Sequence, residues 1–412
     1  MTTTRRTTTA TAEATTAALR LDYLSSDTLT AQPPSWWRDV LGVVGFEKVP
    51  VIDGARVPVT ATMTPALGTT DSLCEVWRVA GATTPLTNGA LRADRAAGLD
   101  QAPGVEQAAG IEQVAGDEQA AGPGRAVPHC RVQYRYCDDL LFGCITIDER
   151  LVDPAGSHDA AQPLDLDRPP EARAAASGSA ALSRATETAY HQIFAVLDET
   201  KHRHLLRIWN YLPEINREID GDERYRHFNS ARQMAFRNSG RATMGTVPAA
   251  SALGSAAGSP ISIYFLAARQ PPKMIENPRQ TSAYHYPPKF GRHSPIFSRA
   301  CVLSAAAGTN LFVSGTASIV GHETIHQGDV AAQTRETMAN ISALLGEANR
   351  AVGSARYRLG GLKLKVYVRR ASDLGAVKAA LAESVPIPSS IVFVQADVCR
   401  EDLLMEIEAT GE

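Results

Sequence analysis

The sequence is poor in cysteine, and it lacks both long apolar runs and an excess of basic residues. Six cysteines among 412 residues are too sparse for a disulfide framework, which favours free thiols in a reducing compartment. No apolar run approaches the roughly 20 residues of a membrane-spanning helix, and the threonine-rich N-terminus has no apolar core like that of a secretory signal. With 41 Lys and Arg against 44 Asp and Glu, the chain has no basic surplus for nucleic acid or an anionic membrane. We therefore expect a cytoplasmic protein, and a small anionic substrate stays open because it needs only a few local arginines.

The chain is too long for one compact core, so two domains are expected. Glycine recurs every six residues in one low-complexity stretch, for which a surface-loop insertion without assigned function is the simplest interpretation. A second loose stretch is rich in Pro, Ala, Asp and Gly and is typical of a linker. The predicted division is a disordered leader (1–20), an N-terminal α+β domain (21–180, with the insertion at 96–124 and the linker at 153–179), a helical segment with central strands (181–290) and a C-terminal domain (291–412).

Apolar periodicity predicts the secondary structure of the second half. Tyr190, Ile193, Phe194 and Leu197 follow helical spacing, and the predicted helix runs toward Pro213, which limits its continuation. Later segments alternate between strands and helices and end on a strand, which indicates an α+β layer with helices on one face of a sheet. The predicted helices cover 222–236, 329–348 and 372–383, and the predicted strands cover 261–267, 311–319, 362–368 and 390–398.

Two groups of residues invite a metal-site interpretation. Cys130 and Cys137 lie seven residues apart, a spacing unlike the tight pairs of zinc sites, and residues 130–147 are better explained as a β-hairpin with structural cysteines. Residues 322–326 read His-Glu-Thr-Ile-His, which matches a zinc-protease pattern that requires a helix. Here the pattern follows a strand and precedes Gly328, so we predict no metal and no other cofactor.

The end of the chain, residues 396–408, combines a thiol with several carboxyl groups after a strand-like run. In an extended segment, Glu406 and Glu408 share one face with Leu404, while Met405 and Ile407 occupy the other face. A core position for the apolar face would therefore hold Glu406 at a fixed place on the opposite side. The alternative is a solvated carboxylate on an edge strand, and Glu408 has no predicted role.

Two sets of segments in the second half of the chain carry a family likeness. The first set comprises 298–299, 312–319, Asp329, Gln333, 340–341, 365–368 and 406–408, and it resembles the RidA (YjgF) family. The second set comprises 207–216, 223–229, 248–254, 314–323 and 396–408, and it resembles the chorismatases, whose C-terminal domain is RidA-like. Imine deaminases of the RidA type use an arginine where this chain has Ser389 and Ser390, so the resemblance does not extend to their deaminase site. The resemblance implies an α+β fold with a RidA-like C-terminal domain and a second α+β N-terminal domain.

Chorismatases release the enolpyruvyl group of chorismate as pyruvate, and the resemblance gives Glu406 the role of general acid on the enolpyruvyl methylene. A buried carboxyl suits that role because burial disfavours its charged form. Members that form 3-hydroxybenzoate carry a cysteine at the position of Cys399 and a glycine at that of Gly315, whereas the hydrolases have alanine at the position of Cys399. The resemblance therefore implies an enzyme of the 3-hydroxybenzoate synthase type, a lyase of secondary metabolism, with Cys399 directing aromatisation.

Chorismate carries two carboxylates, which arginines commonly bind in pairs of hydrogen bonds. The predicted partners of the substrate are Arg292 and Arg299 with Tyr284 or Tyr286, and further candidates are Arg224 and Arg207. Three alternatives stay open: a hydrolase that gives a dihydroxycyclohexadiene carboxylate, formation of 4-hydroxybenzoate, and a non-catalytic RidA-like binding protein. A monomer or a small homo-oligomer is expected.

Overall fold

The structure is a computed structural model. It describes residues 18–52, 57–69, 71–80, 85–92, 131–151, 178–305, 308–385 and 391–412. The glycine-hexad insertion, Ser389 and Ser390, and most of the predicted leader and linker lie outside these residues, and the predicted domain boundaries stay a prediction.

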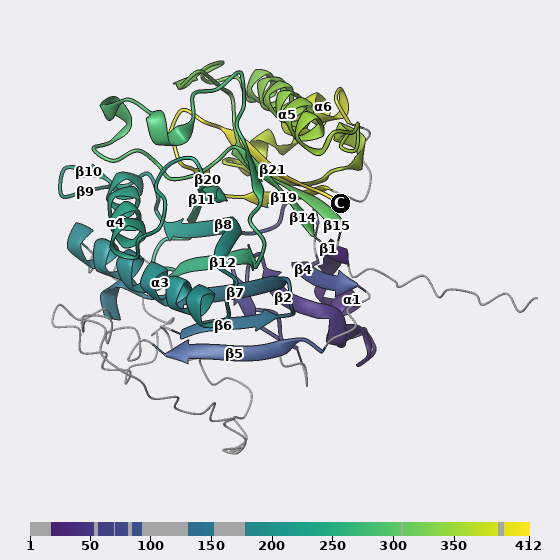
Figure 1. Ribbon diagram of the computed structural model, residues 1–412. Coiled ribbons are helices and arrows are strands. Elements are labelled where there is room, and N and C mark those ends of the chain that lie inside the picture. The colour runs from purple at the N-terminus through teal and green to yellow at the C-terminus, as the bar shows by residue number, and fades with distance from the viewer. Residues whose placement is uncertain are drawn as a thin grey trace, which may run out of the picture.

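Three β-sheets enclose a shared core, and helices cover the outer faces of the two larger sheets (Figure 1). Trp77, Trp209 and Phe312 come from different sheets and meet in this core. The ring centroid of Trp77 lies 5.7 Å from that of Trp209 and 6.2 Å from that of Phe312. Burial of these large aromatic surfaces fixes the three sheets against one another.

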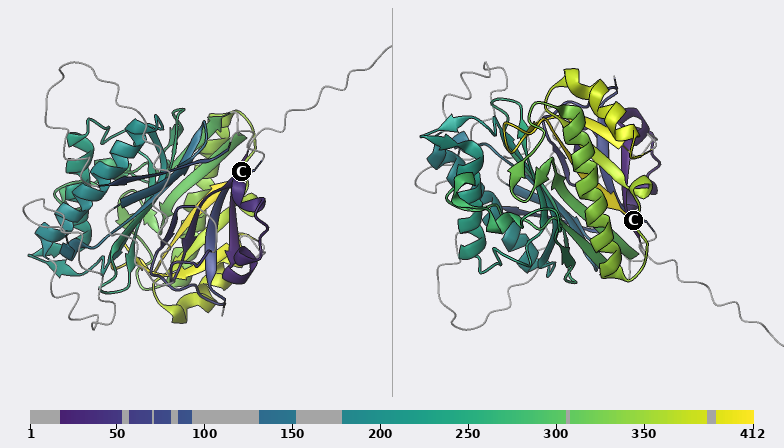
Figure 2. Two further views of the ribbon diagram at one scale, coloured as in Figure 1. Left: turned by 90° about the horizontal axis from the view of Figure 1, so that it is seen from below. Right: turned by 90° about the horizontal axis from the view of Figure 1, so that it is seen from above.

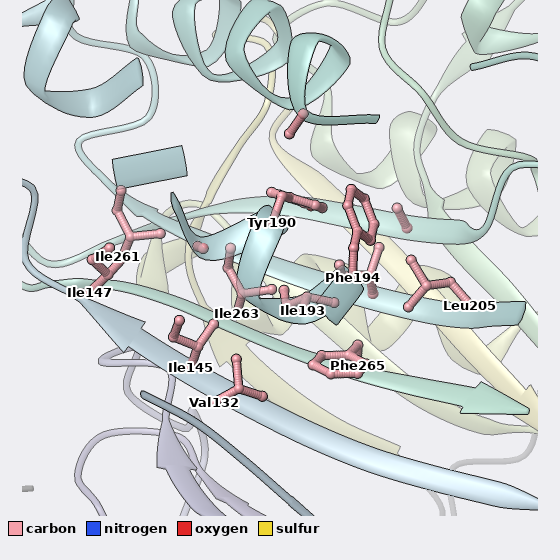
Figure 3. Close-up of a cluster of buried hydrophobic side chains, with 14 of the residues drawn as sticks. Val132, Ile145, Ile147, Tyr190, Ile193, Phe194, Leu205, Ile261, Ile263 and Phe265 are labelled. Atoms are coloured by element: carbon pink, nitrogen blue, oxygen red, sulfur yellow. The ribbon is translucent and has the colours of Figure 1, made fainter. Parts of the chain in front are cut away.

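The seven-stranded sheet carries helices α3 (Ser179–Glu199) and α4 (Arg224–Asn238) on its outer face. Figure 3 shows side chains of α3, among them Tyr190, Ile193 and Phe194, over aliphatic and aromatic side chains of the strands. The strand order is β20 (Asp397–Val398), β11 (Ala249–Ser255), β8 (His204–Pro213), β12 (Ile261–Ala268), β7 (Leu140–Ile147), β6 (Arg131–Tyr136) and β5 (Thr87–Arg92).

The six-stranded sheet carries helices α5 (Val330–Val352) and α6 (Leu374–Ala382) on its outer face. Figure 2 shows these helices and α3 and α4 on opposite sides of the molecule, with the sheets between them. The strand order is β13 (Lys273–Ile275), β14 (Ala300–Ala305), β15 (Gly308–Thr316), β21 (Met405–Gly411), β18 (Lys363–Val368) and β19 (Ile391–Gln395).

A four-stranded sheet from the N-terminal part of the chain closes the remaining side of the shared core. Its order is β1 (Ala18–Ser25), β4 (Leu73–Ala80), β2 (Val40–Gly45) and β3 (Val59–Ala61), and helix α1 (Ser26–Thr30) follows β1. Two short hairpins, β9 (Glu218–Ile219) with β10 (Asp222–Glu223) and β16 (Ile319–Val320) with β17 (Glu323–Thr324), complete the described strands.

The predicted alternation of strands and helices in the last third is confirmed, and so is its packing of helices on one sheet face. The prediction that the helix at Tyr190 runs toward Pro213 was wrong. Helix α3 ends at Glu199, Lys201 adopts a left-handed conformation with φ of 64°, and His204–Pro213 form strand β8. This strand lies between β11 and β12 and is buried on both faces, so its nearly continuous apolar run carries no periodicity that separates strand from helix.

The two metal candidates have other local structures. Strands β6 and β7 form the predicted hairpin, with Gln133 opposite Cys144, and the cysteines in the described part of the chain are free thiols. Residues 322–326 include strand β17 of the small β16–β17 hairpin, which confirms that the His-Glu-Thr-Ile-His pattern does not lie on a helix. Among the described residues, no helix is long and apolar enough to cross a membrane.

Candidate functional site

A cleft of about 830 Å³ opens beside β21, and several of the sequence-predicted site residues line it. Its walls come from α4 with the β9–β10 hairpin, from the segment before β14, from β15, and from the connection between β20 and β21. The residues that line it include Tyr225, Tyr286, Arg299, Gly315, Cys399, Arg400 and Glu406.

Strand β21 holds Glu406 at the inner end of this cleft. Met405 and Ile407 pack in the core under α5 and α6, so alternation turns Glu406 to the opposite face, where only 4% of it is exposed. The strand lies between β15 and β18 in the middle of the sheet. The predicted alternation is confirmed, and the alternative of a solvated edge-strand carboxylate is wrong.

The Glu406 carboxyl is buried without a full set of hydrogen bonds. Its Oε1 atom has no hydrogen-bond partner among the described residues. Burial raises the pKa of Glu406, and the nearby Glu408 carboxylate raises it further, to about 8, although Arg207 and Arg299 act in the opposite direction. The group therefore carries a proton at neutral pH and is able to donate it to a molecule in the cleft.

The Glu406 carboxyl occupies the space in which a side chain at position 315 would lie, and Gly315 has no side chain there. A Cβ atom at Gly315 would lie 1.9 Å from Glu406 Oε1 and 2.8 Å from Ser251 Oγ. The Gly315 amide also donates to Ser251 Oγ at 3.1 Å, which fixes the strand at this point. Any side chain at position 315 would displace the acid, so the glycine is a steric requirement of this carboxyl position.

Cys399 lies beside Glu406 at the end of β20 and is partly exposed to the cleft. Burial in apolar surroundings raises the pKa of its thiol to about 12, and the Glu406 charge adds to this effect. The side chain is therefore a neutral thiol at physiological pH, so it offers a weak proton donor and a compact apolar surface rather than a thiolate.

Two guanidinium groups in the cleft lie near the ring of Tyr286. The Cζ atoms of Arg299 and Arg400 are 5.6 and 5.2 Å from the ring centroid, and Arg299 Nη2 donates to the Tyr286 hydroxyl at 2.8 Å. Arg299 Nε and Arg400 Nη2 are buried and have no hydrogen-bond partner among the described residues. Both residues line the cleft, and each therefore has an unused hydrogen-bond donor in the cleft wall.

A smaller cavity continues inward from Glu406 and Cys399 toward α4. Arg232 and Asn229 line it, and Arg232 Nε and Nη2 and Asn229 Nδ2 are buried without a partner among the described residues. Tyr225 lines both this cavity and the main cleft. These polar groups give the inner end of the site a positive charge and further hydrogen-bond donors.

Sequence reasoning did not select Arg400 or the inner α4 residues. Tyr225, Asn229 and Arg232 are spaced by four and three residues, which places them on one face of the helix and was the available signal. Arg400 directly follows Cys399 inside the segment that carries the family likeness.

Four of the predicted binding residues lie elsewhere. Arg292 is exposed and does not line the cleft, and the Tyr284 hydroxyl contacts Glu276 at 3.5 Å. Arg224 is buried in an ion pair with Glu149 at 2.6 Å, and Arg207 pairs with Glu408 at 2.6 Å. Arg224 and Arg207 are therefore partners in internal ion pairs. None of the four residues is among those that line the cleft, so the structure does not support substrate contacts by them.

Comparison with known proteins identifies the family. Residues 171–267 match the family described as "Chorismatase FkbO/Hyg5-like, N-terminal", and residues 296–412 match "Endoribonuclease L-PSP". A 3-hydroxybenzoate synthase from Streptomyces hygroscopicus is 42% identical over 235 residues, which cover 55% of this chain and 68% of that protein. The chain belongs to the chorismatase family. A chorismatase from Streptomyces rapamycinicus is 39% identical over 248 residues, covering 58% of this chain and 72% of the relative.

The fold comparison agrees with this membership. A chorismatase crystal structure superposes with a TM-score of 0.69 and 27% sequence identity, covering 97% of this chain and 99% of that chain. The expected α+β chorismatase fold with a RidA-like C-terminal part is therefore confirmed.

Proposed function

We propose that this chorismatase converts chorismate to 3-hydroxybenzoate and pyruvate. The observation that carries the proposal is the buried Glu406 carboxyl, protonated at neutral pH, with its unpartnered Oε1 atom beside a cleft that contains arginines. The relatives named 3-hydroxybenzoate synthase and chorismatase support the substrate and the product class.

Glu406 starts the reaction as the general acid. It transfers its proton to the methylene carbon of the enolpyruvyl group, and the electrons of the double bond form the new C–H bond, which leaves an oxocarbenium ion. The carboxylate that results is negative and stabilises this cation in a site of low dielectric. The two products together contain all the atoms of chorismate, so no water is consumed on this route.

Cys399 and Gly315 favour the aromatic product over hydrolysis. The hydrolytic alternative consumes a water molecule, which must reach the oxocarbenium carbon. The neutral thiol of Cys399 occupies space beside Glu406 and offers a proton donor to the rearranging substrate, whereas alanine there would leave room for water. A monomer or a small homo-oligomer stays the expected assembly.

The substrate carboxylates bind to arginines. We assign one carboxylate to Arg299. Its Nε atom has no hydrogen-bond partner among the described residues, and it is close enough to Glu406 for its charge to lower the pKa of that carboxyl. The second carboxylate has two candidate partners, Arg400 at the cleft wall and Arg232 at its inner end.

Replacing Arg299 by Met is expected to raise KM for chorismate by about 10- to 100-fold, because hydrogen bonds to a charged group contribute about 1.5–3 kcal/mol. Steady-state kinetics of pyruvate release measure the change. Arg292→Met is the matched control, because Arg292 is exposed and outside the cleft, and its KM should equal that of the wild type. A larger effect in the control than in Arg299→Met would reverse the assignment.

Incubation of the purified protein with chorismate tests the function itself. Pyruvate and 3-hydroxybenzoate are expected in equal amounts by chromatography with mass detection. A dihydroxycyclohexadiene carboxylate as the main product would make the protein a hydrolase, and 4-hydroxybenzoate would change the site of aromatisation. Binding of chorismate without release of pyruvate would indicate a non-catalytic binding protein.

A further inference from the structure

A cluster of buried charges lies behind the site, where the three sheets meet. Lys365 Nζ is 2.5 Å from Glu75 Oε2 and 2.8 Å from Glu408 Oε1, and Arg207 Nη2 is 2.6 Å from Glu408 Oε2. Glu75 comes from the four-stranded sheet, Arg207 from the seven-stranded sheet, and Lys365 and Glu408 from the six-stranded sheet. Two carboxyl groups thus face two cations in a buried region, where burial raises the pKa of Glu75 and Lys365 acts in the opposite direction.

Glu408 accepts hydrogen bonds at both of its oxygens. Trp209 Nε1 donates to Oε1 at 2.7 Å, while Ser251 Oγ and the Tyr367 hydroxyl donate to Oε2 at 3.0 and 3.1 Å. Burial raises the pKa of Glu408, but the charges of Lys365 and Arg207 outweigh burial and bring the pKa below its ordinary value. The carboxylate therefore stays ionised and fixed, in a buried position for which the sequence predicted no role.

Glu406 has the opposite environment although it lies only two residues away on the same face of β21. The cations of the cluster are committed to Glu75 and Glu408, and Glu406 Oε1 has no hydrogen-bond donor among the described residues. A second negative charge beside Glu408 would be compensated only in part by Arg207 and Arg299, so burial and the charge of Glu408 favour the neutral form of Glu406.

We propose that Glu408 is a positioning residue whose fixed negative charge, held by Lys365 and Arg207, keeps the reactive proton on Glu406. The proposal rests on the role of Glu406 as general acid in the proposed function. It gives the charged cluster a part in the reaction beyond joining the three sheets.

Other groups also act on the two carboxyls. Glu406 faces the cationic Arg207 from β8, Arg299 from the segment before β14 and Arg232 from α4, together with the titratable groups of Tyr225 and Cys399. The pKa of Glu406 is still about 8, so burial, which is the largest influence, and repulsion by Glu408 together outweigh the cations. The remaining groups around Glu408 are Tyr211 from β8, Tyr264 from β12, Tyr23 from β1 and Glu75 from β4.

The test removes the charge of Glu408 and measures the titration of Glu406. In Glu408→Gln the Glu406 carboxyl should titrate about one to two pH units lower than in the wild type, as expected for a unit charge roughly 7 Å away at an effective dielectric constant near 20. Carbon-13 NMR of protein labelled at the glutamate carboxyls measures this without substrate, and the Glu406 resonance is assigned by its loss in Glu406→Gln. The alkaline limb of kcat against pH should move down by the same amount.

Two variants separate this role from a structural one. Glu75→Gln removes a carboxylate of the same cluster whose charge is not among the main influences on Glu406, so it should lower stability without moving the Glu406 titration. Glu408→Asp keeps the charge and should retain the wild-type alkaline limb even if turnover falls. An unchanged Glu406 titration in Glu408→Gln, or an equal shift in Glu75→Gln, overturns the proposal.

If Glu408→Gln does not fold, a double variant tests the same effect. The double variant Arg207→Met, Glu408→Gln removes the ion pair of these two residues as a unit and leaves the pair of Lys365 and Glu75 in place. A smaller downward shift is then expected, because Glu408 raises the pKa of Glu406 more than Arg207 lowers it. Because the titration is read without turnover, an unshifted Glu406 refutes this inference alone, whereas absence of pyruvate from the wild type refutes the proposed function alone.

Discussion

Glu406→Gln is expected to lower the rate of pyruvate release from chorismate by about a thousandfold, in the range that a general acid contributes. Glutamine keeps the size of the side chain but has no proton to transfer to the methylene carbon. The loss should appear in kcat at every pH, and KM should change little because the arginines that bind the substrate remain. Stopped-assay detection of pyruvate over hours measures the residual rate.

The control for this variant is Glu223→Gln. Glu223 lines the same cleft and burial raises the pKa of its carboxyl as well, so the pair compares two cleft carboxyls of which only one faces Gly315. Glu223→Gln should keep most of the wild-type activity. Loss of activity in Glu223→Gln with retention in Glu406→Gln would transfer the acid role to Glu223.

Thermal or denaturant unfolding shows whether Glu406→Gln loses activity because the proton donor is missing or because the fold is damaged. Because folding raises the pKa of Glu406 from 4.5 to about 8, its contribution to stability is complete below pH 4.5 and is lost as the pH rises through 8. Glutamine does not titrate, so the variant should gain stability relative to the wild type as the pH rises across this window. A variant that is inactive and also less stable at pH 8 would instead indicate damage to the fold.

Cys399→Ala is expected to change the product, with most of the 3-hydroxybenzoate replaced by the dihydroxycyclohexadiene carboxylate and with pyruvate release maintained. The thiol lies beside Glu406, and its removal opens room for a water molecule at the oxocarbenium carbon, which is bonded to the methylene carbon that Glu406 protonates. Chromatography with mass detection distinguishes the products, since the diene acid is heavier by one water. An unchanged product would remove the assigned role of the thiol.

Two further variants sharpen the product experiment. Cys137→Ala is the matched control, because Cys137 is a partly buried free cysteine outside the cleft, and its product should stay aromatic. The second is the double variant Gly315→Ala, Cys399→Ala. A Cβ atom at position 315 would lie 1.9 Å from Glu406 Oε1, so the alanine displaces the carboxyl of Glu406 while the thiol is also absent. Comparison of its product ratio with that of Cys399→Ala shows whether the position of the Glu406 carboxyl affects the product beyond the loss of the thiol.

Local sequence patterns predicted much of the fold because they depend on neighbours along the chain. Helical spacing located α3 and α5, and two-residue alternation placed Met405 and Ile407 on one face of β21 with Glu406 on the other. Strand β8 was the exception, since a strand buried on both faces has no period and its apolar run resembles that of a buried helix.

The candidate site was predicted in part. Glu406, Cys399, Gly315, Arg299 and Tyr286 meet in one cleft, whereas Arg292 lies outside it. Segments 223–229 and 396–408 both line this cleft because α4 covers the seven-stranded sheet and β20 pairs with β11 of the same sheet, an arrangement that no local pattern contains. Arg232 and Arg400 were missed for that reason.

The sequence by itself determined which residues carry the chemistry and on which face of the last strand they stand, since alternation and motif spacing are local properties. Only the tertiary structure decided what covers that face. Arg207 is 201 residues away from Glu408 in sequence, and its ion pair with Glu408 makes this a buried, fixed charge, while Glu406 beside it is left to hold a proton. The difference between the two glutamates comes from the side chains that the other sheets place against them, because desolvation and charge pairing depend on contacts between distant parts of the chain.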